Sequence, residues 1–342
     1  MIAYLLRRLL LTIPTLLGIT LIVFTLTRFV PGGPIEKMMT NAQFASGDNS
    51  AHIVRDRASS SGTLDEKQLA ELKAYYGFDK PVFVSYAQWL WRVLHLDLGY
   101  STRYGEPVWD TVTSRMPLSL FYGGISLLIT YAVCIPLGIV KALRHNSRFD
   151  HLSAALIFLG FAIPNYVLGI LLITLFASHW EIFPLGGFAS DDLADLSWTE
   201  QVRDIFMHAV LPLTTYLIGS FAVMTMLMKN SLLENLASDY VRTAVAKGLT
   251  FRQAVFRHAL RNSLIPLATS FGHGISIILS GSFLVETIFN IDGMGLLGYE
   301  SLVERDYPVV MVFLVISSLL FLIGNILSDL CVAAIDPRVR FE

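Results

Sequence analysis

The chain has 342 residues, of which 54% are hydrophobic and 15% are charged, and its formal net charge at pH 7 is −2. Soluble domains carry about 25% charged residues, so this composition excludes an ordinary water-soluble protein and indicates a chain that lies in a bilayer. The near-neutral total gives no support to nucleic-acid binding.

Six apolar stretches are long enough to cross a bilayer as helices, which takes roughly 20 residues each. They lie at 9–26, 117–140, 152–178, 207–228, 264–285 and 309–328. The first follows Arg7 and Arg8 as a signal peptide would, but no small-residue cleavage site comes after it, so we expect a retained helix. The sequence therefore predicts an all-α polytopic membrane protein with six transmembrane helices.

Basic residues gather in alternate connections between the stretches, as expected of cytoplasmic loops. If the N-terminus is inside, the cytoplasmic pieces hold Arg7, Arg8, Lys141, Arg144, Arg148, Lys229, Arg242, Lys247, Arg252, Arg257, Arg261, Arg338 and Arg340. The outside loops 179–206 and 286–308 hold only Arg203 and Arg305, among several acidic residues. We therefore expect both termini to be cytoplasmic.

The segment 31–114 follows an N-terminal helix at 1–30 and is too long for a simple connection, so we expect a small helical domain outside the membrane. Its polar part at 41–62 has little to bury and favours a mobile loop. A capping box of Thr63 with Glu66 predicts one helix that ends at Gly77. A second amphipathic helix is expected after Pro81, with its apolar face formed by Val82, Tyr86, Trp89, Leu90 and Val93. Trp89 and Trp91 suit a membrane interface.

The remaining residues, 115–342, form the expected five-helix core, and its largest cytoplasmic loop is 229–263. Leu233, Leu236, Tyr240 and Ala244 recur at helical spacing and predict a short helix that ends at Gly248. Thr250 and Gln253 form a capping box, which starts a second helix that runs to about Asn262. The result is an L-shaped plug whose tip, at 244–249, has small side chains. Any cytoplasmic loop is cationic, but that does not explain the caps on both sides of Gly248.

Several sequence pieces resemble one family. DYVRTAVAKGL at 239–249 and HALRNSLIP at 258–266 are similar to the ATPase-coupling loop of the membrane-spanning subunits of bacterial ATP-binding-cassette (ABC) importers, in the oligopeptide and dipeptide permease branch. The B-type subunits of that branch also match at PGGP (31–34), GFDKPVFVSYAQWL (77–90), DLGYS (97–101) and DPRVR (336–340). Of the superfamily's wider coupling-loop pattern, only Ala244, Gly248 and Leu260 are matched here.

The resemblance implies a type I ABC importer permease fold in a bacterial inner membrane, with segment 31–114 as a periplasmic insertion. It implies as partners a homologous second permease subunit in a heterodimer, two ABC ATPase domains and a periplasmic peptide-binding protein. The chain has no GxxxxGK[ST] loop, so we expect no cofactor and no enzyme activity in it, with ATP and Mg bound by the partners. The residues implied to contact the ATPase are Tyr240, Arg242, Thr243, Ala244, Ala246, Lys247, Gly248, Leu249, Thr250, Arg261 and Asn262.

The implied cargo is oligopeptides. The insertion at 41–62 and MTMLMKNSLLE at 224–234, with Lys229 where an arginine is commoner, look like the broad-range peptide importer of Gram-negative bacteria that also admits the antibiotic microcin C. Nickel, haem, dipeptide and antimicrobial-peptide systems share this permease frame and stay open as alternatives.

Prolines and glycines punctuate the spans. Pro136, Pro164 and Pro212 are expected to interrupt helices, and Gly272, Gly274 and Gly281 to allow close packing or bending. The candidates for pathway or packing positions are Pro164, Asn165, His273 and Ser280.

Few charged residues fall within the apolar stretches. Arg28, Glu286 and Asp329 are expected near helix ends, where they reach water, and only His273 lies well inside a span, where we expect a hydrogen bond between helices. An ion-coupled secondary transporter, the main alternative, should show a carboxylate pair or relay at mid-membrane. An intramembrane protease would need a nucleophile with a base, and Ser280 lacks the preceding glycine of a serine-protease turn. No spacing of Cys, His or carboxylates predicts a metal site, and Cys134 and Cys331 are interpreted as small apolar residues.

Overall fold

The computed structural model describes residues 2–29 and 79–336. Within these ranges the regular elements are all helical, which confirms the predicted all-α class. The loop expected at 41–62, the helix expected after Thr63 and the PGGP motif lie outside the described residues, as does most of the C-terminal DPRVR motif.

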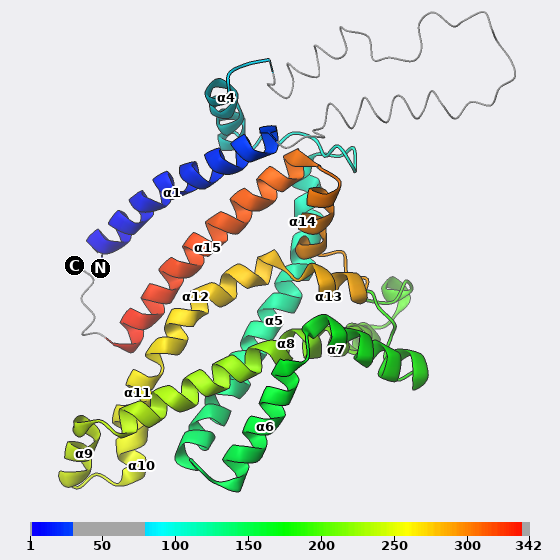
Figure 1. Cartoon of the computed structure of the whole chain (residues 1–342). Helices are drawn as coiled ribbons and strands as arrows, with labels where there is room; N and C mark the ends of the chain where they lie inside the picture. The colour runs from blue at the N-terminus through cyan, green and yellow to red at the C-terminus, as the bar shows by residue number, and fades with distance from the viewer. Residues whose placement is uncertain (1, 30–78, 337–342) are drawn as a thin grey trace, which may run out of the picture. The chain divides into compact units, whose positions relative to one another are not determined.

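Figure 1 shows the helices in chain order. They are α1 (Ile2–Phe29), α4 (Val82–Leu94), α5 (Val108–Leu143), α6 (Arg148–Ala162), α7 (Asn165–Leu172), the π-helix η1 (Ile173–His179), the short η2 (Leu193–Asp195), α8 (Trp198–Leu236), α9 (Asp239–Ala246), α10 (Phe251–Ala254), the π-helix η3 (Val255–Ala259), α11 (Leu260–Ser263), α12 (Ile265–Ser280), α13 (Phe283–Ile288), α14 (Met294–Val303) and α15 (Tyr307–Ile335).

Four of the described helices are long and apolar enough to cross a membrane: Arg7–Phe29, Val108–Leu143, Trp198–Leu236 and Tyr307–Ile335. A fifth candidate is the pair Arg148–Ala162 and Asn165–His179, which is long and apolar enough only when taken together and is bent by 94° at its break. The sixth stretch predicted from the sequence, 264–285, is not one helix. It is divided between α12, which has 16 residues, and α13.

The prolines behave differently from one another. Pro136 and Pro212 lie inside the continuous helices α5 and α8, so the expected interruption at these two positions was wrong. A long helix packed among neighbours tolerates the loss of one backbone donor. At Pro164 the expectation was right: Ile163 is extended, with φ −86° and ψ 123°, because a residue before proline avoids the helical region, and α6 ends there.

The chain divides into two compact units. Unit 1 comprises Met1–Thr12, Arg115–Leu297 and Ser317–Glu342, and unit 2 comprises Ile13–Ser114 and Gly298–Ile316. Several long helices pass from one unit into the other.

In unit 2, α4 packs on α1 through the face predicted from the sequence. The Tyr86 hydroxyl lies 2.8 Å from the Thr20 hydroxyl, and the ring centroids of Tyr86 and Trp89 lie 5.7 and 5.8 Å from that of Phe24. Trp91, two positions on, is exposed on the other side of α4. The two tryptophans therefore have different surroundings, and only Trp91 is placed for an interface with lipid or another protein.

Unit 2 also contains a buried clamp between two distant segments. The Asp306 carboxylate, which has no exposed surface, accepts hydrogen bonds from the Ser101 hydroxyl at 2.5 Å and from the backbone N–H groups of Thr102 and Arg103, each at 3.2 Å. The Arg103 guanidinium pairs with Glu300 at 2.8 Å. The DLGYS motif thus owes its shape to a residue near the start of α15.

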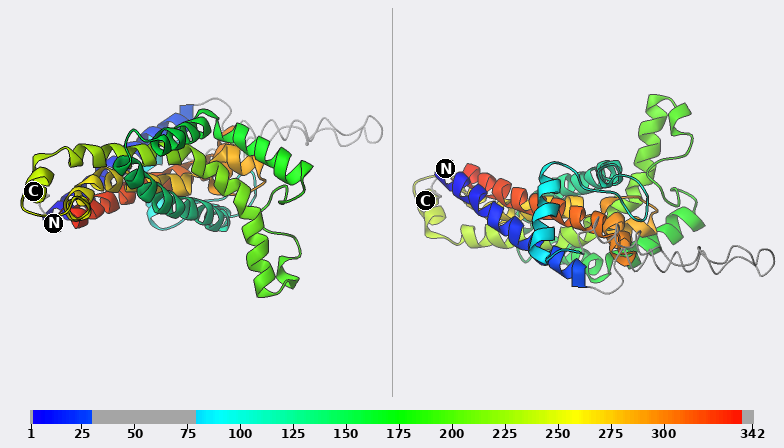
Figure 2. Two further views of the ribbon diagram at one scale, coloured as in Figure 1. Left: turned by 90° about the horizontal axis from the view of Figure 1, so that it is seen from below. Right: turned by 90° about the horizontal axis from the view of Figure 1, so that it is seen from above.

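In unit 1, α8 is the central helix and packs against α6, α7 and α12. One cluster of buried residues gathers beside its C-terminal half and contains Met228, Leu232 and Leu267. A second cluster surrounds α13 and contains Tyr122, Phe289 and Ile291. In both views of Figure 2 the first part of α8, with the loop before it, projects sideways from the other helices of this unit.

Close helix packing occurs where the glycines predicted it. A Cβ on Gly272 in α12 would collide with the backbone of Gly324 in α15, so the two helices touch backbone to backbone there. Small residues permit such contact between membrane helices. Gly281 instead marks a bend, because its φ is +60°.

Candidate functional site

The segment 239–263 folds into two short helical legs joined at Gly248. The first leg, α9, ends in a Schellman motif: Gly248 has φ +96°, its N–H donates to the Val245 carbonyl at 2.9 Å, and the Leu249 N–H donates to the Ala244 carbonyl at 3.3 Å. Glycine adopts this backbone conformation without the penalty that a Cβ brings. The predicted helix stop at Gly248 is confirmed.

The second leg starts at the predicted capping box. The Thr250 N–H donates to the Gln253 side chain at 3.1 Å, and the Gln253 N–H donates to the Thr250 hydroxyl at 3.4 Å. From there α10, η3 and α11 follow one another without interruption to Ser263. The middle of this leg, η3, has π-helical hydrogen bonding, which the sequence pattern did not predict.

The first leg differs from the prediction in two respects. Leu233 and Leu236 belong to the end of α8, and a turn separates them from Tyr240 in α9, so the expected short helix is the junction of two helices. Ala244, expected at the exposed tip, is buried in the core cluster beside Met228. The apolar spacing was correct, but it describes an inward face.

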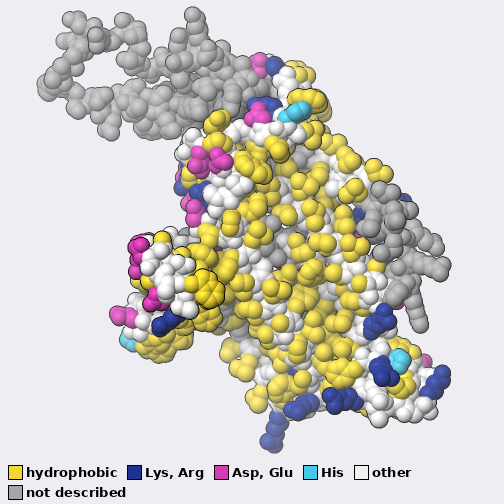
Figure 3. Space-filling view, turned by 180° about the vertical axis from the view of Figure 1, so that it is seen from behind, with side chains coloured by type: hydrophobic (Ala, Val, Ile, Leu, Met, Phe, Trp, Pro, Cys, Tyr) yellow, Lys and Arg dark blue, Asp and Glu magenta, His cyan; other side chains and the backbone are white. Residues whose placement is uncertain are grey.

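The outward surface of the two legs is basic with apolar patches. Among the predicted contact residues, Tyr240, Arg242, Thr243, Ala246, Lys247, Gly248, Thr250 and Arg261 are exposed, whereas Leu249 and Asn262 are half-buried. Phe251 and Phe256 are exposed beside them. In Figure 3 the Lys and Arg side chains gather at this end of the molecule. Exposed aromatic rings within a basic rim suit contact with another protein.

Hydrogen bonds fix the legs to the helices that carry them. The Tyr240 hydroxyl donates to the Asn235 side chain at 2.7 Å and accepts from the Asn262 amide at 3.2 Å, so it joins α8, α9 and α11. The Arg261 side chain donates to the Ile335 carbonyl at the end of α15, at 2.5 Å. The structure thus brings together Tyr240 and Asn262, which the sequence had placed in one loop without predicting their contact.

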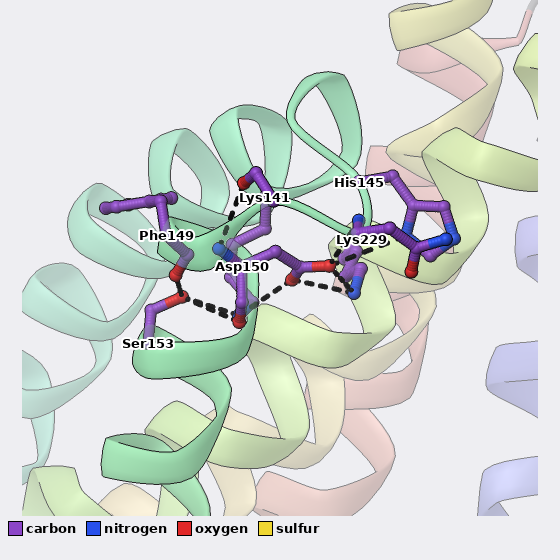
Figure 4. A network of polar contacts seen from close by, with 8 residues as sticks. Lys141, His145, Phe149, Asp150, Ser153 and Lys229 are labelled. Atoms are coloured by element: carbon purple, nitrogen blue, oxygen red, sulfur yellow. Dashed lines mark hydrogen bonds and ion pairs between the residues drawn. The ribbon is translucent and has the colours of Figure 1, made fainter.

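A buried charge cluster lies next to this loop, at the point where α5, α6 and α8 meet (Figure 4). The Lys229 ammonium in α8 donates to both oxygens of the Asp150 carboxylate, at 2.8 and 2.7 Å. The Lys141 ammonium in α5 lies 3.1 Å from the same carboxylate. We call Lys141, Asp150 and Lys229 the ion triad.

Hydrogen bonds to neighbouring groups also stabilise the ion triad. Besides the carboxylate, Lys141 donates to the Asp150 carbonyl at 2.8 Å and to the Ser153 hydroxyl at 2.7 Å, which uses all three of its donors. Asp150 is 2% exposed, and it also accepts from the Asn146 N–H at 3.2 Å. Burial of charge is costly, and ion pairing with these hydrogen bonds offsets part of that cost.

Sequence reasoning assigned Lys141 and Lys229 to cytoplasmic loops and missed the triad. A usable signal was present, because the ends of spans two and four and the start of span three fall on one predicted side of the membrane. Asp150 is an acidic residue at that level, close to Lys141, Arg144, Arg148 and Lys229, and this pattern indicates an ion pair between helix ends.

The predicted pathway positions lie at helix breaks. Pro164 and Asn165 stand at the 94° bend between α6 and α7, and a Cβ on Gly219 of α8 would lie 3.1 Å from the Asn165 side-chain oxygen. Ser280 is the last residue of α12, and its side chain is outside the described part. His273 lies in α12 with its side chain exposed, and the expected hydrogen bond between helices does not occur within the described residues.

Glu286 contradicts its prediction. It was expected near a helix end in contact with water, but it is 2% exposed. Glu286 lies in α13, which packs against α7 and α8 instead of continuing α12 out of the core.

Comparison with known proteins gives the family. Residues 134–341, more than half of the chain, match the family model described as "Binding-protein-dependent transport system inner membrane component". The chain belongs to this family.

Similar permeases cover the whole chain. It is 39% identical to the peptidoglycan transport system permease protein YejB of Agrobacterium fabrum, over 99% of this chain and 98% of that protein. It is also 39% identical to the inner membrane ABC transporter permease protein YejB of Escherichia coli O157:H7, over 99% of both chains. The dipeptide transport system permease protein DppB of Escherichia coli K12 is 34% identical over the full length of both.

Membership of this permease family settles several expectations. The permease is an inner-membrane transport component of ABC type and not an enzyme, because members of the family move solutes while ATP hydrolysis belongs to partner ATPases. Family membership also implies a binding protein as a partner.

Proposed function

We propose that this permease imports peptides in an ATP-driven ABC transporter and that the two legs of 239–263 form its coupling loop. One observation carries the proposal: the legs present an exposed surface of Arg242, Lys247, Phe251 and Phe256 around Gly248, while hydrogen bonds fix both legs to long helices. A surface of this kind suits a partner protein that binds the loop and displaces it when the partner changes conformation. The other predicted contact residues, buried Ala244 excepted, share in this surface.

The contacts support movement of the loop as a rigid body. Closure of the ATPases on ATP would displace the loop, and Tyr240 would carry that displacement to α8 and α11. The ion triad would extend it to α5 and α6, since Lys229 in α8 holds Asp150 and Asp150 holds Lys141. Rocking of packed helices around a shared pathway is a recognised route to alternating access.

The proposed cargo is peptides. The similar permeases are named for transport of peptidoglycan, dipeptides and, in Bacillus subtilis, oligopeptides, and these solutes share peptide bonds and a wide range of side chains. Peptide-like antibiotics such as microcin C are included in this proposal as candidate cargo.

The proposed topology has six crossings with both termini in the cytoplasm, where the coupling loop also lies. The bent pair α6–α7–η1 supplies one crossing, and α12 with α13 supplies another that is broken. The positions of the basic residues support this orientation. We further propose a heterodimer with a homologous permease subunit, two ATPase domains that bind ATP and Mg, and a periplasmic peptide-binding protein.

The test is uptake of a labelled short peptide into cells that contain the full transporter, with wild-type permease compared with Gly248→Asp. The aspartate adds bulk and negative charge to the basic surface, where a Cβ on Gly248 meets no atom within 4 Å of its own chain. We expect uptake to fall by about tenfold or more, because a misplaced charge in a protein interface costs several kcal/mol.

The matched control is Gly105→Asp. Gly105 also has positive φ, +70°, and its Cβ also meets nothing within 4 Å, so the backbone strain is similar at a site far from the loop in sequence. Unchanged uptake in Gly248→Asp, or equal losses in both variants, would contradict the proposal. Uptake driven by a proton gradient without any ATPase would instead indicate an ion-coupled transporter.

A further inference from the structure

Glu286 is buried without any basic partner among the described residues, and its carboxylate is held by the starts of two helices. It accepts from the Leu296 N–H in the first turn of α14 at 2.6 Å, and from the Ser282 N–H at the start of α13 at 3.3 Å. The Tyr216 hydroxyl of α8 lies 3.5 Å away. Backbone donors at helix starts are otherwise unpaired and carry partial positive charge, so one carboxylate serves both helices.

Two glycines make room for this carboxylate, and a third makes room for the backbone turn beside it. A Cβ on Gly281 would collide with the Glu286 carboxylate, and a Cβ on Gly293 would lie 2.7 Å from its carboxyl carbon. A Cβ on Gly295 would lie 2.8 Å from the Ser282 nitrogen, in the contact between the starts of α13 and α14. The turn is therefore built around Glu286, and we call Glu286 with Gly281, Gly293 and Gly295 the glycine cradle.

The glycine cradle closes the break between α12 and α13. The apolar stretch 264–285 could span a bilayer, yet α12 stops at Ser280 and α13 turns aside. Irregular backbone at membrane depth occurs where protein buries it or where it lines a cavity, and interrupted helices in transporters mark the transport path.

The second broken helix meets the same part of α8. Tyr216 faces Glu286 at the α12–α13 break, and Gly219, one turn later, touches Asn165 at the α6–α7 break. In addition, α13 packs on α7, where a Cβ on Gly169 would lie 3.3 Å from the Phe289 ring. Both breaks therefore lie together against the middle of α8.

We propose that Glu286 is a positioning residue for translocation. It holds α13 and the start of α14 together as one rigid body beside the two helix breaks. This body forms part of the pathway wall and moves as a unit between defined states. The proposal rests on the transport function of the family and is independent of the coupling loop. Loss of the carboxylate would free α13 to move without the rest of the permease. Import would then become inefficient relative to ATP consumption.

The test combines two measurements on Glu286→Gln, which keeps the side-chain size but replaces one acceptor oxygen with an amide donor. Peptide imported per ATP hydrolysed is measured in membrane vesicles that contain the complete transporter. The rate at which a maleimide labels Leu284→Cys, a half-exposed α13 position, is measured on the purified transporter in lipid nanodiscs, with and without trapped ATP. Both cysteines of the background, Cys134 and Cys331, are changed to alanine.

We expect Glu286→Gln to lower the peptide-to-ATP ratio by about tenfold, because a lost hydrogen bond to a charged group shifts an equilibrium by about that factor. ATP hydrolysis should stay near the wild-type rate, and labelling of Leu284→Cys should rise and lose its dependence on ATP. The matched control is Glu200→Gln, which alters an exposed carboxylate that caps α8 through Ser197, and it should change neither readout. An unchanged ratio with unchanged labelling overturns the proposal, as does an equal fall of uptake and ATP hydrolysis.

A second variant decides the case if Glu286→Gln does not reach the membrane. Gly293→Ala keeps Glu286 and has no positive φ to strain, but its Cβ displaces the carboxylate. It should lower the peptide-to-ATP ratio in the same direction, and a wild-type ratio in a normally assembled Gly293→Ala transporter overturns the proposal. Failure of the coupling-loop proposal would appear separately, as normal uptake in Gly248→Asp.

Discussion

Asp150 and Glu286 are each 2% exposed, and the molecule stabilises them in opposite ways. Asp150 is surrounded by two lysine ammonium groups from other helices. Glu286 receives backbone N–H groups from the starts of α13 and α14. The ion triad joins elements through side chains, whereas the glycine cradle joins them through main chain.

The difference determines what each site tolerates. In the ion triad, the charge of Asp150 matters most, because its removal leaves two buried ammonium groups unpaired. In the glycine cradle, backbone shape matters most, because the donors cannot move independently of their helices. The ion triad should therefore lose most stability when Asp150 loses its charge, and the cradle when a side chain is added to one of its glycines.

The largest effect is expected from Asp150→Asn, which leaves two buried ammonium groups with a neutral partner. Loss of one member of a buried ion pair costs about 3–5 kcal/mol. The free energy of unfolding, measured by urea titration in mixed micelles, should fall by that amount. The control Asp239→Asn removes an exposed acid 3.7 Å from Arg242 and should cost less than about 1 kcal/mol.

Replacement of the whole ion triad sharpens the same point. The triple variant Lys141→Met, Asp150→Leu and Lys229→Met removes every charge at similar volume, and it should be more stable than Asp150→Asn alone. If the triple variant is the less stable of the two, charge balance is not what the triad requires.

A smaller loss of unfolding free energy is expected from Gly281→Ala. Alanine is strained at the positive φ of this position, and its Cβ would also collide with the Glu286 carboxylate. The strain alone costs about 1–2 kcal/mol, and the collision adds to it. The control is Gly187→Ala, where φ is +90° but the nearest atom to the Cβ is 3.6 Å away. Equal losses of unfolding free energy in the two variants would show that the collision with Glu286 adds nothing to the backbone strain that both variants share.

The smallest effect is expected from Lys229→Arg. Lys229 already contacts both oxygens of Asp150, and a guanidinium fork suits such two-point contact, so stability should change by less than about 1 kcal/mol. Lys141→Arg should cost more, about 1–3 kcal/mol, because Lys141 has no exposed surface and a larger group would strain its site. Both losses of unfolding free energy are measured in the same titration. Their ratio tests whether the two lysine sites differ in the space around the side chain, since both variants keep the charge.

Local signals in the sequence predicted the helical class and the positions where the helices of the loop end and begin. Thr250, Gln253 and Gly248 act on neighbours within a few positions, so their effects could be read from spacing alone. The same holds for the face of α4 that contacts α1. The domain limits at 30 and 114, and the six crossings, stay predictions.

The contacts of Asp150 and Glu286 could not be predicted in this way. Asp150 meets Lys229 79 positions later, and no local pattern records that contact. Glu286 is held by backbone N–H groups, which every residue but proline carries, so its partners leave no trace in residue type apart from the surrounding glycines. Pro136 and Pro164 show the same limit, since tertiary packing decides which proline ends a helix.

The clamp of Asp306 on the DLGYS segment also has a consequence for biosynthesis. Ser101 and Asp306 are 205 positions apart in the chain. Ribosomes add about 5–20 residues per second, so about 10–40 seconds separate the synthesis of the two residues. During that interval the N–H groups of Thr102 and Arg103 have no carboxylate to bind. The loop can close only after Asp306 has been made, and its resistance to a protease therefore reports whether synthesis has reached the residue before α15.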